Sequence, residues 1–166
     1  MTRSPSARPV SPMIRPPRHG VSRVVYPADF NTAAAVIAEV HRTHGQIWTI
    51  VVPKADVAEL LSPDEARRAM ADGGIDLEWA GLRRESAEVL LVAVGAYQLE
   101  QAVAAARRLG ERSIAHRVVV LLEPGRFRRA RTAREQAHQA TPQTRARLFP
   151  ERCRGVVLAT HTRRSS

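Results

Sequence analysis

The sequence contains very little cysteine and very little lysine. Among its 166 residues, Cys153 is the one cysteine and Lys54 the one lysine, beside 25 arginines. A single cysteine excludes an intramolecular disulfide and any zinc site built on cysteines, so a cytosolic protein is the simplest interpretation. A bias this strong toward arginine is typical of a GC-rich coding sequence, which lowers the functional weight of each arginine and makes Lys54 worth examining.

Long apolar runs are also missing. The longest, at residues 89–96, is less than half of the ~20 residues that a membrane-spanning helix needs. The first 20 residues are rich in arginine and proline and have no apolar core, so they do not form a secretory signal, and their prolines would break the helix of a transit peptide. We therefore predict a cytoplasmic protein with no membrane partner.

Acidic residues are absent or scarce at the two ends of the chain. Residues 1–23 hold five arginines and no acid, and residues 126–166 hold 11 arginines against Glu135 and Glu151. Residues 24–125 carry a net charge of −4, although the whole chain carries +10. The basic charge thus belongs to the ends, and the hydrophobic fraction of 44% is that of an ordinary globular protein.

Residues 1–20 are predicted to be a disordered basic leader, because proline and small polar residues leave nothing to bury. A first unit, 21–87, shows a short strand at 21–26 and a helix with an apolar face formed by Ala33, Val36, Ile37 and Val40 that closes at Gly45. A buried strand is predicted at 47–52, a helix from Ser62 to Gly73, and a half-buried strand or connector at 75–79.

A second unit, 88–166, begins with an apolar strand at 89–94, followed by a helix at 97–109 and another apolar strand at 118–122. Continuous apolar strands around a helix are typical of a parallel sheet that is covered on both faces. One helix is expected around 130–140, and a last strand at 155–160. The predicted class is α/β, with a partial parallel or mixed sheet and flanking helices.

Several short segments occur in an order that matches a known family. They are a proline-x-aspartate-x-asparagine stretch at 27–31, an apolar strand ending in Pro53-Lys54, a helix start at Leu61-Ser62, a glycine-isoleucine pair at 74–75, and Glu78-Trp79-Ala80. Together with the strands at 89–95 and 118–122, they resemble phosphoketolases. The resemblance implies that 21–87 is the end of a pyrimidine-binding domain with its linker, and that 88–166 is part of a C-terminal transketolase-like domain.

The resemblance also implies a chemistry. Phosphoketolases bind thiamine diphosphate and magnesium between two domains and convert ketose phosphates to acetyl phosphate. The glycine-aspartate-glycine motif for diphosphate and magnesium is missing from this sequence, so the chain is expected to bind no cofactor by itself. It is predicted to be either a truncated phosphoketolase-like protein without catalysis of its own, or one subunit of a split enzyme whose partner supplies the cofactor-binding domains.

Of the positions that have a functional role in phosphoketolases, only the lysine has a counterpart in this sequence, at Lys54. The resemblance implies that it contacts the substrate phosphate, which suits the point charge of an ammonium group. The chain differs by having Pro53 where the family has glycine, and a solvated lysine at a strand end is the simpler interpretation. No catalytic, cofactor-binding or metal-binding residue is predicted.

Four other features have a structural interpretation that outweighs a functional one. His41 and His44 could share a metal ion, but no third ligand follows at a diagnostic spacing. Gly95 at a strand-to-helix turn resembles a phosphate-cradling position, although a glycine there often only permits the turn. Trp48 and Trp79 are expected in the core. Cys153 lies between two arginines without a catalytic partner and is taken as incidental.

A second hypothesis is a basic adaptor that binds nucleic acid or an acidic partner through its arginine-rich ends. The arginines at 126, 128, 129, 131 and 134 form a dense cluster that could neutralise phosphates. Only Phe127 interleaves with them, and no nucleic-acid-binding signature is present. Weak, non-specific binding of nucleic acid is therefore the expectation from this cluster.

Overall fold

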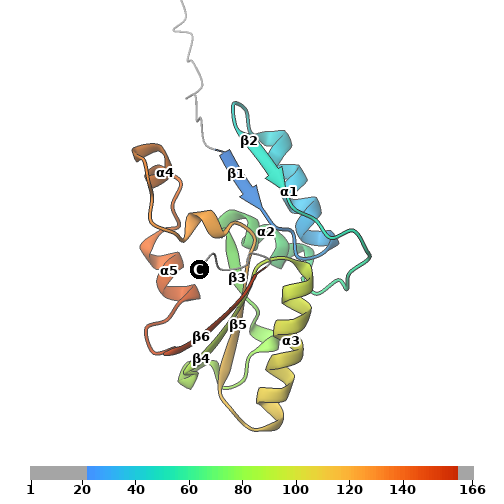
Figure 1. The fold of residues 1–166 in the computed structure, drawn as a ribbon, viewed down its shortest axis with the longest axis vertical. Coiled ribbons are helices and arrows are strands. Elements are labelled where there is room, and N and C mark those ends of the chain that lie inside the picture. Colours follow the sequence, from blue (N-terminus) through green and yellow to red (C-terminus); the bar gives the residue numbers. More distant parts are fainter. Residues whose placement is uncertain (1–21, 161–166) are drawn as a thin grey trace, which may run out of the picture.

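Two β-sheets, joined side by side, organise the part of the chain that the structure describes. The computed structural model describes residues 22–160 (Figure 1). The elements, in chain order, are β1 (Ser22–Val25), α1 (Phe30–Arg42), β2 (Ile47–Ile50), α2 (Pro63–Asp72), β3 (Gly74–Asp76), β4 (Val89–Ala93), α3 (Ala96–Glu111), β5 (His116–Leu121), α4 (Ala133–Ala137), α5 (Pro142–Leu148) and β6 (Gly155–Ala159).

The larger sheet has four strands in the order β3-β5-β4-β6. Strands β4, β5 and β6 are parallel, and β3 runs antiparallel to β5. Alternate residues of β4 and β5 enter two separate cores, one containing residues of α3 and the other containing Leu148 at the end of α5. This two-sided burial explains why both strands are continuously apolar in the sequence.

The smaller sheet is a parallel pair, β1 and β2, connected through α1. It meets the larger sheet where β1 and β5 end, because the backbone N–H of Tyr26 donates to the carbonyl of Leu122 at 2.8 Å. Asp29 caps α1 and its Oδ2 also accepts the backbone N–H groups of Leu60 and Leu61, at 3.0 and 2.7 Å. The carboxylate thereby fixes the chain that leads into α2.

The local signals in the sequence place α2 correctly at both ends. Ser62 and Glu65 form a reciprocal capping box, Pro63 occupies the first turn, and Gly73 ends the helix with φ of 82°. The α/β class with a mixed sheet and flanking helices is confirmed.

Several predictions of burial are wrong. The strand predicted at 47–52 is the four-residue edge strand β2, whose Ile47 is 71% exposed, because β1 is its only neighbour in the described sheet. Ile37, expected on the apolar face of α1, is 51% exposed, and Trp79, expected in the core, is 49% exposed in a 3-10 turn. Trp48 is half-buried, with the guanidinium of Arg23 over its ring at 3.8 Å.

Other differences concern where elements begin and end. Helix α1 ends at Arg42 instead of Gly45, and α3 continues past Gly110, the expected stop, to Glu111. The helix expected around 130–140 is the five-residue α4, and α5 follows it outside the predicted range. The predicted leader at 1–20 lies outside the described residues, and the boundary at 87/88 stays a prediction. None of the helices in residues 22–160 has the length and apolar character needed to cross a membrane.

Candidate functional site

Lys54 lies at a cavity formed where three strands end. The cavity has a volume of about 290 Å³, and its lining includes Tyr26, which follows β1, Pro53 and Lys54, which follow β2, and Gly95 and Tyr97, which follow β4. Ligands of open α/β sheets bind outside the carboxyl ends of the strands. Lys54, the predicted phosphate contact, and Gly95, which resembles a phosphate-cradling position, therefore line one cavity.

The electrostatics of this cavity favour an anion. The sixteen-residue helix α3 begins here, with Gly95 as its N-cap at φ of 95° and no side chain capping its first turn. A helix N-terminus carries partial positive charge. The Lys54 ammonium is exposed and makes no hydrogen bond or ion pair to any residue in 22–160. Pro53, the residue before Lys54, lines the same cavity.

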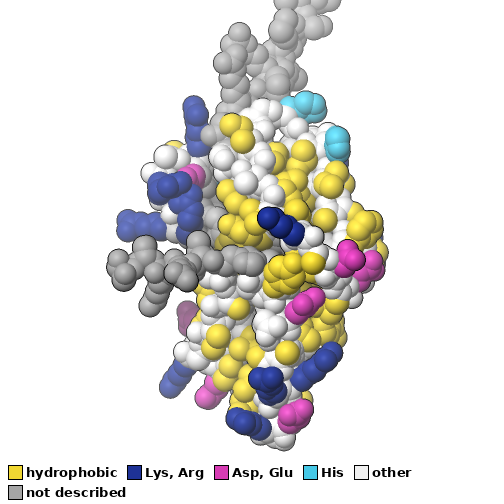
Figure 2. Space-filling model, turned by 45° about the vertical axis from the view of Figure 1, so that its right-hand side comes forward, with side chains coloured by type: hydrophobic (Ala, Val, Ile, Leu, Met, Phe, Trp, Pro, Cys, Tyr) yellow, Lys and Arg dark blue, Asp and Glu magenta, His cyan; other side chains and the backbone are white. Residues whose placement is uncertain are grey.

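A second, larger cleft adjoins this cavity at Tyr26, which lines both. It has a volume of about 1080 Å³ and lies between β1, the residues that follow β5, and the segment around α4. Figure 2 shows arginine side chains gathered on the side where Figure 1 places α4. Its lining includes Arg128, Arg131 and Arg134.

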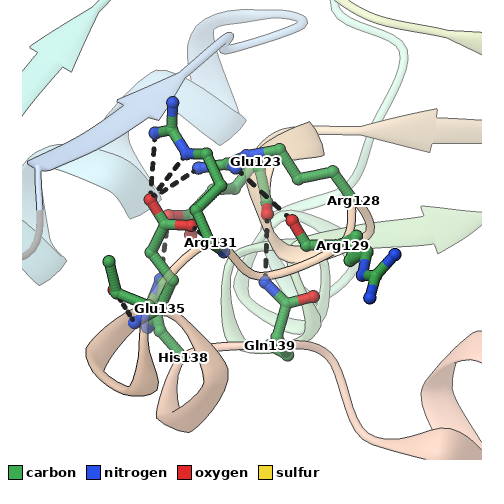
Figure 3. A network of polar contacts seen from close by, with 9 residues as sticks. Glu123, Arg128, Arg129, Arg131, Glu135, His138 and Gln139 are labelled. Atoms are coloured by element: carbon green, nitrogen blue, oxygen red, sulfur yellow. Dashed lines mark hydrogen bonds and ion pairs between the residues drawn. The ribbon is translucent and has the colours of Figure 1, made fainter.

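A buried ion network lies beneath this cleft. Glu123, only 2% exposed, accepts hydrogen bonds from Arg23 at 2.9 and 2.6 Å and is bonded to His138 Nε2 at 2.9 Å. Burial alone would raise the pKa of Glu123, but the hydrogen bonds from His138 and Arg23 outweigh it and the pKa is lowered. Figure 3 shows His138 and Gln139 pointing from the α4 segment toward Glu123 and its neighbours.

Sequence reasoning missed this network. Glu123 directly follows an apolar strand, which is a position where functional residues gather in α/β proteins, and that was the one available signal. Its partner Arg23 is 100 residues away in the chain, so no spacing pattern could have indicated the pair.

The remaining singled-out residues do not form a site. His41 and His44 are exposed, and within residues 22–160 no group of three His, Cys, Asp or Glu side chains is placed to hold a metal ion. Cys153 is buried, its thiol donates to the Ala87 carbonyl at 3.2 Å, and burial raises its pKa. That environment fits a packing role rather than a reactive thiol.

Comparison with known proteins supports the fold but not a specific family. No protein-family model matches the sequence, and no curated protein matches it. Among solved structures, a transketolase variant from Pichia stipitis is similar to it with a TM-score of 0.57 and 21% identity over 82% of this chain. A second variant of that transketolase, in complex with fructose 6-phosphate, is similar with a TM-score of 0.54 and 21% identity over 78% of this chain.

A third structure, the same transketolase with sedoheptulose 7-phosphate, gives a TM-score of 0.52 at 18% identity over 82% of this chain. In all three cases this chain covers 17% of the transketolase chain. The described residues therefore have the fold of a portion of transketolase, an α/β arrangement with a mixed sheet.

Proposed function

We propose that this chain is a phosphoketolase-like protein of sugar-phosphate metabolism, without catalysis of its own, that supplies Lys54 to an active site completed by a partner chain. The observation that carries the proposal is the convergence of Lys54 and the N-terminus of α3 on one cavity at the carboxyl ends of β1, β2 and β4. The similar transketolases include complexes with fructose 6-phosphate and sedoheptulose 7-phosphate, and a sugar phosphate is the ligand that such a cationic cavity suits.

The lining of the Lys54 cavity does not fit the diphosphate-bound magnesium of such an enzyme. Magnesium bound to a diphosphate takes one or two carboxylate ligands together with phosphate oxygens, and the lining of the Lys54 cavity contains no carboxylate. In our proposal the partner chain holds both thiamine diphosphate and magnesium.

Exposed strand edges support the presence of a partner. Strand β6 is one of the two edge strands of the larger sheet, and its Val156, Val157 and Leu158 are 54–58% exposed. Strand β2 is likewise an edge with apolar side chains in solvent. Long apolar edges are normally covered, because their free N–H and C=O groups pair with other chains.

The test is purification of the tagged full chain from its native cells, followed by assay of the recovered material for acetyl phosphate made from fructose 6-phosphate or xylulose 5-phosphate. We expect a partner that carries thiamine diphosphate and a measurable activity. Recovery of the chain alone, with no acetyl phosphate, would overturn the proposal.

The role of Lys54 is tested separately with Lys54→Met in the same preparation. We expect the partner to be recovered in equal yield and KM for the phosphorylated substrate to rise about tenfold, the cost of one charge-assisted hydrogen bond. Arg107→Gln, an exposed cation at the other end of α3, is the matched control and should leave KM unchanged. An unchanged KM in Lys54→Met would remove the phosphate contact while leaving the partner hypothesis standing.

The alternative, an adaptor for nucleic acid or an acidic partner, has less support from the side chains. Arg128 and Arg131 pair with Glu135, and Arg126 donates to the Ala71 carbonyl at 2.6 Å. The adaptor hypothesis stays a prediction. Measuring nucleic-acid affinity at increasing salt tests it, because binding through phosphate contacts weakens by orders of magnitude between about 50 and 200 mM salt. An affinity that does not change with salt concentration would contradict the adaptor hypothesis.

A further inference from the structure

The larger cleft, beside Tyr26, has an excess of positive charge on its rim. Arg128, Arg131 and Arg134 line it, and Glu135 is the one carboxylate among them on the rim. The other carboxylate of the lining, Glu123, is neutralised from below by Arg23. The cleft therefore presents a concave surface that attracts an anion carrying two charges.

Two of the three rim arginines are held in place before any ligand arrives. Glu135 Oε1 accepts from Arg128 Nη2 and from Arg131 Nη2, each at 2.9 Å, and Glu135 Oε2 accepts the backbone N–H of Arg131 at 2.8 Å (Figure 3). A guanidinium has five N–H donors, so each arginine keeps donors that Glu135 does not use. Holding the side chains beforehand reduces the entropy that a ligand must overcome.

The third rim arginine has no partner among the residues that the structure describes. Arg134, in α4, is exposed and makes no hydrogen bond or ion pair to any residue in 22–160. Strand β1 and the residue after it contribute Ser22, Val24 and Tyr26 to the lining, and the last two offer apolar and aromatic surface. The cleft thus combines a cationic part with a part suited to a sugar or a base.

We propose that this cleft binds a small organic phosphate, with the phosphate on Arg128, Arg131 and Arg134 and the organic part against Val24 and Tyr26. Guanidinium groups match phosphate oxygens with paired hydrogen bonds. A small molecule fits better than a nucleic acid, because Phe127, the one aromatic residue among the clustered arginines, packs edge-on against Phe149 at 5.6 Å instead of offering a face to a base. This site is separate from Lys54 and does not depend on the proposed function.

The experiment is calorimetric titration of the purified full chain at low salt with fructose 6-phosphate, AMP, inorganic phosphate and a mixed-sequence RNA oligonucleotide. The first two probes distinguish a sugar phosphate from a nucleotide. The variants are Arg134→Gln and Arg131→Gln in the cleft, with Arg68→Gln and Arg107→Gln as charge-matched controls outside it. Each variant removes one positive charge at an exposed position, so a general effect of net charge would appear equally in all four.

We expect saturable 1:1 binding of fructose 6-phosphate or AMP, tighter than that of inorganic phosphate. Arg134→Gln and Arg131→Gln should each weaken it about tenfold, the loss of one charge-assisted hydrogen bond, while the two controls stay within about twofold. Equal loss in all four variants, loss in neither cleft variant, no saturable binding of either small probe, or binding of the oligonucleotide alone would each overturn the proposal.

Discussion

Glu123 keeps its charge in a place that water hardly reaches. It is 2% exposed, yet Arg23 and His138 both contact its carboxylate. Arg23 is itself buried and stacks on Trp48. Each charge is therefore acceptable in the interior only because the other is present, and removing one partner leaves a buried charge without compensation.

We predict that Arg23→Met lowers the free energy of unfolding by about 3 kcal/mol, because Glu123 loses its main counter-ion. Methionine keeps apolar contact with Trp48, so lost packing contributes little. Arg23→Met/Glu123→Met should recover most of the loss, since a buried ion pair is often replaceable by apolar residues. Urea unfolding of the two variants and the wild type checks this. A double variant as unstable as the single one would contradict the account.

The ion pair of Arg23 and Glu123 also predicts how the stability of the fold depends on pH. Because the pKa of Glu123 in the folded chain lies below its ordinary value of 4.5, its stabilising contribution is fully present above that value. The contribution disappears as the pH falls through the lowered pKa. Thermal unfolding between about pH 3 and pH 7 should show a steeper acid loss in the wild type than in Arg23→Met/Glu123→Met. If the unfolding temperatures of the two proteins change in parallel with pH, the Glu123 carboxylate does not contribute to stability as described.

At the scale of elements, β3 depends on a glycine. A Cβ at Gly74 would lie 2.7 Å from both the Val120 carbonyl oxygen and the Leu121 Cδ2, within the ladder that joins β3 to β5. The strand can approach β5 this closely only because this position has no side chain.

We predict that Gly74→Ala destabilises the fold by about 1–3 kcal/mol through overpacking. Gly125→Ala is the matched control, because a Cβ at Gly125 meets nothing within 4 Å, and it should stay within about 0.5 kcal/mol of the wild type. The midpoints of urea unfolding provide the comparison. If Gly74→Ala and Gly125→Ala change the unfolding midpoint equally, the spacing between β3 and β5 adjusts to the added methyl group.

Elements that depend on local backbone chemistry could be predicted from the sequence, whereas the burial of others could not. Helix α2 was predictable because Ser62, Pro63 and Gly73 act on the adjacent backbone. Strand β2 was not, because an apolar strand has the same pattern whether a core or another chain covers it, and here Ile47 lies in solvent. Local chemistry determines where an element starts, whereas burial depends on neighbours that are distant in sequence.

The candidate site follows the same rule. Lys54 and Gly95 could each be singled out from local sequence, but that they line one cavity is a property of the sheet topology. The arginines of the larger cleft were visible as a cluster, whereas the pairing of Arg128 and Arg131 with Glu135 was not.

At the scale of the whole molecule, the exposed strand β6 predicts self-association of the purified chain, because edge strands pair with other chains when nothing covers them. Val157→Lys should shift the chain toward a monomer, since a lysine on an edge strand opposes pairing. Gln101→Lys, which adds the same charge on an exposed position of α3, should not. Light scattering over a concentration series measures the mass, and identical behaviour of the two variants would exclude β6 as the contact.

The distance along the chain between Arg23 and Glu123 has a consequence for synthesis. On a ribosome, Arg23 is made 100 residues before the carboxylate that neutralises it. Until Glu123 emerges, the nascent chain holds an uncompensated cation, and β1 lacks its junction with β5. The backbone hydrogen bond between Tyr26 and Leu122 that joins the two sheets therefore cannot form until Leu122 has left the exit tunnel.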